Sequence, residues 1–107
     1  MIRIRVTRRN GHIVRVCADG HAGCAPKGED IICAAVSVLV QTFFFSLQRL
    51  LSLDVEADIS DGHFSLSIPT DLAPALQEQV TLLGESMLVG LDEINRSYPG
   101  FLQVSEE

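Results

Sequence analysis

His21 and Cys33 have complementary chemistry and stand twelve positions apart in the stretch GHAGCAPKGEDIICAAVS, residues 20–37. A thiolate is a strong nucleophile, and a nearby imidazole can accept the thiol proton and later donate it to a leaving amine. Such a pair is the minimum for covalent acyl transfer. The pattern also has a structural explanation, because a cysteine in an apolar helix is often packed as a small hydrophobic residue.

The second half of this stretch predicts a helix that is capped by Asp30 and runs to about Leu51. Cys33 would then lie in the first turn, where unpaired backbone N–H groups and the helix dipole favour a thiolate. Ser37 comes four positions later, so its side chain should share one helix face with Cys33. Asp30 either orients His21 in addition or is a cap and nothing more.

Three glycines, Gly20, Gly23 and Gly28, predict a loop over residues 20–28. The loop can fold back over the helix that it feeds and so carry His21 toward Cys33. We expect it to be adaptable and to close only on substrate, with His21 beyond hydrogen-bond reach of Cys33 in the unbound protein. Cys24 belongs to the same loop and has no helix terminus to stabilise its thiolate, so Cys33 is the preferred nucleophile.

A metal site is the other chemical possibility. Cys17, His21, Cys24 and Cys33 are four possible zinc ligands, but their spacing lacks the paired C-x2-C of structural zinc sites. Cys17 also belongs to a predicted strand, on the face opposite Val14 and Val16, where we expect a structural role. We therefore expect neither a metal ion nor an organic cofactor.

Alternating apolar and polar residues predict four strands in two hairpins. The strands and the turns that join them are Ile2–Thr7, Asn10-Gly11 and Ile13–Ala18 in the first hairpin, and 54–60, Asp61-Gly62 and 64–68 in the second. In the second strand, Val14, Val16 and Ala18 should form the apolar face. Each hairpin is followed by a helix, so the two halves share one order of elements.

The second helix follows from apolar residues at steps of three and four between Leu76 and Ile94. Thr70 or Asp71 is the expected cap, Pro74 fits the first turn, and the helix should end near Tyr98. Residues 101–107 read as a short acidic tail. The chain, residues 1–107, is thus predicted to be one α+β domain. We expect a two-layer ββαββα sandwich with both helices on one face of a mainly antiparallel sheet.

The first predicted helix is apolar around nearly its whole circumference. A sheet can cover only one side of it, so a second protomer is its natural cover and a homodimer is expected. Residues 31–48 carry no charge and approach the length of a membrane span. Polar residues interrupt them and strands flank the helix, so we interpret it as the core helix of a soluble domain and expect no membrane partner.

Charge and cysteine content narrow the class of protein further. The formal net charge is 8 − 14 = −6, which argues against direct nucleic-acid binding and suits a basic partner. Five Arg and no apolar segment in the first twenty residues argue against a signal peptide. An odd number of cysteines argues against a disulfide framework and predicts thiols in a reducing, cytoplasmic compartment.

The stretch at residues 20–37 resembles the signature of the ribosomal-processing cysteine protease family, often called Prp. That signature is G-H-A, a short variable loop, then G-x-D-[IV]-[IV]-C-A-A-V-S, and the matching residues are Gly20, His21, Ala22, Gly28, Asp30, Cys33, Ala34, Ala35, Val36 and Ser37. The resemblance extends over nearly the whole chain. It includes the first strand, the Asp61-Gly62 turn and the ending LVGLDEINRSYPGFLQVSEE.

The resemblance implies the same ββαββα fold, a homodimer and a proteolytic activity. The nucleophile of the family falls on Cys33 and its catalytic histidine on His21, while its motif Asp and Ser fall on Asp30 and Ser37. Cys24 falls in the variable loop. The implied substrate is the precursor of a basic ribosomal protein, number twenty-seven of the bacterial large subunit, whose N-terminal extension is removed after paired Phe and before a small residue.

The sequence is thus interpreted as a cytoplasmic cysteine endopeptidase with a Cys33/His21 dyad. The alternative is a non-catalytic dimeric module that binds ribosomal or other basic proteins, with Cys33 merely packed. An extension ending in Phe-Phe on the ribosomal protein of the host would favour the protease.

Overall fold

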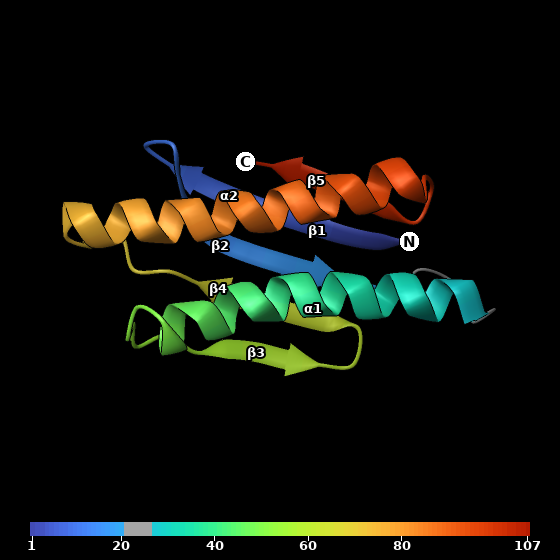
Figure 1. Cartoon of the computed structure of the whole chain (residues 1–107), viewed down its shortest axis with the longest axis horizontal. Coiled ribbons are helices and arrows are strands. Elements are labelled where there is room, and N and C mark those ends of the chain that lie inside the picture. Colours follow the sequence, from blue (N-terminus) through green and yellow to red (C-terminus); the bar gives the residue numbers. More distant parts are fainter. Residues whose placement is uncertain (21–26) are drawn as a thin grey trace.

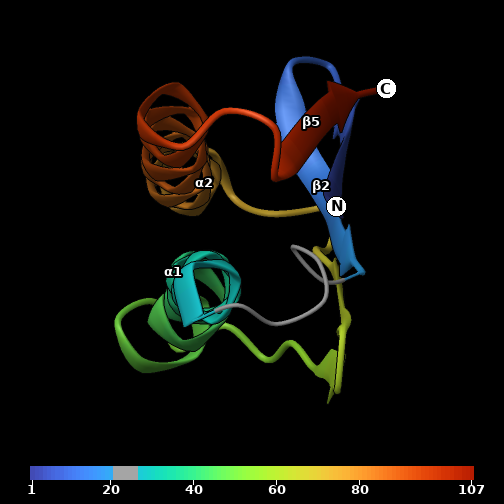
Figure 2. The same cartoon turned by 90° about the vertical axis from the view of Figure 1, so that its right-hand side faces the viewer.

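The computed structural model describes residues 1–20 and 27–107, and for residues 27–30 it describes the backbone alone. The chain forms two layers, with both helices on one face of a five-stranded sheet (Figures 1 and 2). The elements in chain order are β1 (Ile2–Arg9), β2 (His12–Asp19), α1 (Lys27–Arg49), β3 (Ala57–Ser60), β4 (His63–Ser67), α2 (Pro74–Ser97) and β5 (Leu102–Glu106). The predicted α+β sandwich is confirmed.

The strand order in the sheet is β3-β4-β2-β1-β5. All neighbouring strands are antiparallel except β1 and β5, which are parallel. The acidic tail predicted for residues 101–107 is therefore wrong, because most of it forms β5. Leu102 and Val104 alternate with polar residues, and Leu102 is 4% exposed where the strand packs beside Ile2. This pairing covers what would otherwise be an open edge of β1.

Both predicted hairpin turns are present. Asn10 and Gly11 have φ values of 53° and 79°, as a type I′ turn requires, and Gly62 has a φ of 69°. The pairing of β1 with β2 shifts between Thr7 and Arg8, which leaves Val14 without a direct partner. This bulge turns Ile13 into the core at 1% exposure, so the prediction that Val14 faces the core is wrong.

Helix α1 begins at Lys27, so the prediction that Asp30 caps it is wrong. Gly28 lies in the helix and not in a loop. A glycine lowers helix stability by only about 1 kcal/mol, and the packing of a 23-residue helix can outweigh that cost. Cys33 is consequently the seventh residue of α1, in its second turn. The influence of the helix dipole falls off within the first turn, so the predicted first-turn setting of Cys33 does not exist.

Helix α2 begins at Pro74 and ends at Ser97, followed by Tyr98 as expected. Its N-cap is Ala73, which forms no side-chain cap, so the expectation of Thr70 or Asp71 is wrong. Pro74 sets this boundary. A residue that precedes proline is held in extended backbone, and Ala73 has φ −58° and ψ 147°.

The core lies between the sheet and the two helices. In Figure 1, α1 lies over the β3–β4 side of the sheet and α2 over the β1–β5 side. The buried side chains of α1 are Ile32, Val36, Val40, Phe43, Phe44 and Leu47. The helices approach closely where Gly90 of α2 meets Leu39 of α1, because a Cβ on Gly90 would lie 2.7 Å from a Leu39 methyl group.

Within one chain, one side of helix α1 is buried and its outer side is exposed, as expected of an apolar helix that a single sheet covers. Ile31 and Val38 are 64% and 63% exposed on its outer side. The segment Ile31–Arg49 is long and apolar enough to cross a membrane, a test that core helices of soluble proteins also pass. Here one side of the helix contributes to the core described above.

Candidate active site

Cys33 and Ser37 lie one turn apart on α1 and line the same cavity, as their spacing predicts. The cavity has a volume of about 130 Å³ and also receives Gln41, one further turn along the helix. Cys33 is half-buried, so the residue is partly accessible from solvent. Val36 and Val40 form an apolar floor. A peptide could therefore meet the thiol in a partly dehydrated setting.

The rest of the cavity lining comes from the sheet. It includes Ile2, Ala18, Gly20 at the end of β2 and residues 59–64 around the β3–β4 turn. The Gly20 N–H donates a hydrogen bond of 2.9 Å to the carbonyl oxygen of Gly62, which fastens these two segments together. Gly20 has a φ of 98°, and a Cβ there would lie 2.6 Å from the carbonyl oxygen of Met1. Only glycine fits this position.

Three predicted site residues, His21, Gly23 and Cys24, lie outside the described residues. The predicted closure of their loop therefore stays a prediction. Asp30 is described by its backbone alone, in the first turn of α1, so its proposed action on His21 stays a prediction. Of the predicted loop glycines, Gly20 is held by its hydrogen bond to Gly62, and Gly28 is helical. The structure thus brings together Cys33, Ser37 and Gly20.

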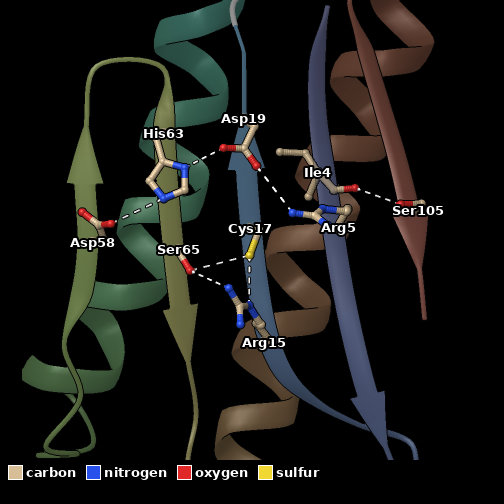
Figure 3. A network of polar contacts seen from close by, with 9 residues as sticks. All are labelled: Ile4, Arg5, Arg15, Cys17, Asp19, Asp58, His63, Ser65 and Ser105. Carbon is tan, nitrogen blue, oxygen red and sulfur yellow. Dashed lines mark hydrogen bonds and ion pairs between the residues drawn. The ribbon is translucent and has the colours of Figure 1, made fainter.

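The two histidines in the described part of the chain have partners elsewhere. The His12 ring contacts the hydroxyl of Thr81 on α2 at 3.1 Å. His63 lies on the face of the sheet turned away from the helices (Figure 3), whereas Cys33 belongs to the helix layer. Neither is therefore placed as a base for Cys33, and His21 remains the candidate.

Cys17 is remote from this cavity. It lies on the outer face of the sheet (Figure 3), where its sulfur accepts a hydrogen bond of 3.1 Å from Arg15 Nε and lies 3.6 Å from the Ser65 hydroxyl. The hydrogen bond to Cys17 raises the pKa of Arg15. The sheet separates Cys17 from Cys33, so the two cannot share a metal ion. No cluster of three or more metal-ligating side chains occurs among the residues that the structure describes.

A polar network on the same outer face was not anticipated from the sequence. It runs across four strands, from Arg5 on β1 through Asp19 on β2 and His63 on β4 to Asp58 on β3 (Figure 3). Asp19 and His63 are direct cross-strand partners, although they are 44 positions apart. No local pattern reveals this, because β2 and β4 are separated by α1 and β3.

A half-buried cysteine in a cavity of a compact α+β domain is the kind of site found in cysteine hydrolases. The sequence profile of the family described as cysteine protease Prp matches residues 1–103. The chain belongs to this family of cysteine proteases.

Individual relatives agree with this membership. The ribosomal processing cysteine protease Prp of Bacillus subtilis is 32% identical and the alignment covers 95% of this chain and 96% of that protein. The protein of the same name from Staphylococcus aureus is 30% identical, with 92% of each chain covered. A crystal structure from Streptococcus mutans has a TM-score of 0.81 at 30% identity and covers 99% and 93% of the two chains.

A further solved structure is that of the S. aureus Prp in complex with a covalently linked product peptide. It has a TM-score of 0.83 at 27% identity and covers 100% of both chains.

Proposed function

We propose that this cysteine protease removes the N-terminal extension of a bacterial ribosomal protein precursor, number twenty-seven of the large subunit. The observation that carries the proposal is the half-buried Cys33, which lines the same cavity as Ser37, Gly20 and the β3–β4 turn. The relatives named as ribosomal processing proteases and the S. aureus complex with a linked product peptide support the substrate class.

The proposed reaction uses a Cys33/His21 dyad. The Cys33 sulfur forms a bond to the scissile carbonyl carbon, and His21 accepts the thiol proton. The C–N bond then breaks as His21 donates that proton to the leaving amine. Water attacks the thioester, releases the acid product and restores the thiol. Backbone N–H groups in the first turn of α1, residues 27–30, are the proposed oxyanion donors, since these groups have no partner within the helix.

Supporting roles are proposed for two more residues. Ser37 lines the cavity one turn beyond Cys33 and contributes to the surface that the peptide contacts. Asp30, in the first turn of α1, is proposed to orient His21. A net charge of −6 suits a basic substrate. No cofactor or nucleic acid is required by this chemistry, and we propose that it takes place in the cytoplasm, away from membranes.

A homodimer is part of the proposal. Ile31 and Val38 on α1 and Leu82 and Val89 on α2 are each more than 60% exposed, from 63% for Val38 to 71% for Leu82. Covering such side chains is favourable by about 25 cal/mol per Å² of apolar surface. We propose that a second copy of the chain covers the outer side of the helix layer.

The deciding experiment is cleavage of a synthetic precursor peptide whose extension ends in Phe-Phe. Cys33→Ala and His21→Ala should each abolish cleavage and leave the circular dichroism spectrum unchanged. Cys17→Ala is the matched control, because it removes a thiol on the other side of the sheet, and it should cleave normally; so should Cys24→Ala. Undiminished cleavage by Cys33→Ala would overturn the dyad, and a wild-type protein that leaves this peptide intact would overturn the substrate.

A further inference from the structure

The His63 ring joins three strands on the outer face of the sheet. Its Nδ1 lies 2.5 Å from Asp19 Oδ1 on β2, and its Nε2 lies 3.5 Å from Asp58 Oδ2 on β3. An ionised carboxylate can only accept, so Nδ1 is the donor to Asp19. The second carboxylate oxygen of Asp19 faces Arg5 Nη2 at 3.8 Å. His63 therefore links the end of β2 to the β3–β4 hairpin (Figure 3).

The residues on either side of this link form the wall of the Cys33 cavity. Gly20 follows Asp19, and Gly62 precedes His63. These two glycines line the cavity and are joined by the hydrogen bond of 2.9 Å described above. The side-chain contact on the outer face and the backbone contact on the cavity face thus hold the same pair of segments. A loss of the outer contact would loosen the inner one.

The position of Gly20 matters for the reaction because the next residue in the chain is His21. The strand that ends at Asp19 determines where the segment that carries His21 starts. Since a displacement of about 1 Å in a catalytic group can cost two orders of magnitude in rate, a firm starting point is worth protecting.

We propose that His63 is a positioning residue, which acts through Asp19 and Asp58 to fix Gly20 and the β3–β4 turn beside Cys33. This inference rests on the proposed Cys33/His21 chemistry, because it assigns to His63 a part in positioning the segment that carries His21. It assigns to the outer face of the sheet a part in the activity of a cavity on its inner face.

A purely stabilising role for His63 is the competing explanation, and the environment of the ring argues against it. The His63 side chain is 36% exposed and the Asp19 side chain is 43% exposed, so neither belongs to the hydrophobic core. Exposed ion pairs contribute about 0–1 kcal/mol to stability. Removing the ring should leave the fold intact while the cavity wall loosens.

The test compares His63→Ala, His63→Asn and Ser65→Ala. Asn places a donor where Nδ1 was, so it should keep the Asp19 contact, whereas Ala removes both contacts. Ser65→Ala is the matched control. It changes a residue on the same strand and the same face, whose partners are Cys17 and Arg15 rather than a cavity residue.

For His63→Ala we expect kcat to fall about tenfold with KM changed less than twofold. His63→Asn should stay within threefold of wild-type kcat, and Ser65→Ala should match wild type. Asp19→Ala should resemble His63→Ala, and combining the two should bring little further loss because both variants remove the same contact between Asp19 and His63. Wild-type kcat in His63→Ala, or equal losses in the Ala and Asn variants, would overturn the proposal.

A second measurement separates this inference from the proposed function. Amide hydrogen exchange at Gly20, followed by NMR, reports its bond to Gly62 without any substrate. We expect exchange about tenfold faster in His63→Ala and unchanged in Ser65→Ala. If Cys33→Ala abolishes cleavage but His63→Ala changes neither the exchange rate at Gly20 nor kcat, the inference alone fails. If no precursor peptide is cleaved while Gly20 exchange does respond, the proposed function fails and the structural link stands.

Discussion

A Cβ at Gly20 would lie only 2.6 Å from the carbonyl oxygen of Met1, a backbone atom that cannot rotate away. Gly20 therefore lacks a side chain for two separate reasons, its φ of 98° and this close approach. Gly100 has the same φ of 98° with nothing within 4 Å of its Cβ position. Comparing Gly20 with Gly100 therefore separates the cost of a positive φ from the cost of the close approach to Met1.

We expect Gly100→Ala to lower the free energy of unfolding by about 1–2 kcal/mol, the cost of an alanine at positive φ. Gly20→Ala should cost at least about 1 kcal/mol more, because the chain must also shift away from Met1. Urea denaturation of both variants measures the difference. Equal losses would mean that the approach of Met1 to Gly20 carries no steric cost.

Arg8 links three elements through its guanidinium group. It donates to Glu85 of α2 at 2.6 Å, to Glu106 of β5 at 2.8 Å and to the Gly11 carbonyl oxygen at 3.2 Å. These contacts, above all those to the two carboxylates, raise the pKa of Arg8 above its ordinary value.

Arg8→Ala should lower the free energy of unfolding by about 1 kcal/mol, a figure reduced for the partial exposure of all three side chains. Arg96→Ala is the control, because Arg96 forms an exposed ion pair with Glu93 at 3.7 Å and is itself 72% exposed. It should change stability by less than about 0.5 kcal/mol. The loss in Arg8→Ala should shrink in 1 M salt, and a loss that is no larger than that of Arg96→Ala would contradict the assignment.

The cavity beside Cys33 offers a test of substrate access. Ser37→Leu would place a bulky side chain in a volume of about 130 Å³, so we expect cleavage of the precursor peptide to fall at least about tenfold. Thr42→Leu adds an apolar side chain to an exposed position of the same helix and should stay within about twofold of wild type. Steady-state kinetics with the peptide measures both. Normal cleavage by Ser37→Leu would place the substrate elsewhere.

The proposed homodimer predicts a mass of roughly twice 11.7 kDa by light scattering at micromolar concentration. Val38→Glu introduces a charge on the exposed outer side of α1 and should shift the protein toward monomer, because an unpaired charge is costly to cover. A wild-type protein that remains monomeric over this range would contradict the prediction.

The elements that follow from local patterns were predicted well from the sequence. The turn at Asn10-Gly11 depends on two residues that tolerate positive φ, and α2 depends on its own apolar spacing. Both are local signals, and both are confirmed. Strand β5 was missed because only two apolar residues mark it, and its place beside β1 depends on a contact between distant segments.

The candidate site shows the same division. The shared face of Cys33 and Ser37 follows from helical spacing alone, and the structure confirms it. The start of α1 was misjudged because Gly28 and Asp30 suggest a loop and a cap, while the packing of the long helix decides otherwise. The Asp19–His63 contact could not be predicted, since it exists only once β2 and β4 pair in their actual register.

The position of β5 bears on how the protein is made. β5 is the last element in chain order, yet it lies directly beside β1, with Ile2 paired to Leu102. Ribosomes deliver the N-terminal residues first, so the nascent chain leaves one edge of β1 uncovered until residues 102–106 emerge. Strand β5 thus joins the sheet after the other strands have been synthesised, and until then the chain exposes an edge strand that chaperones or neighbouring nascent chains can pair with.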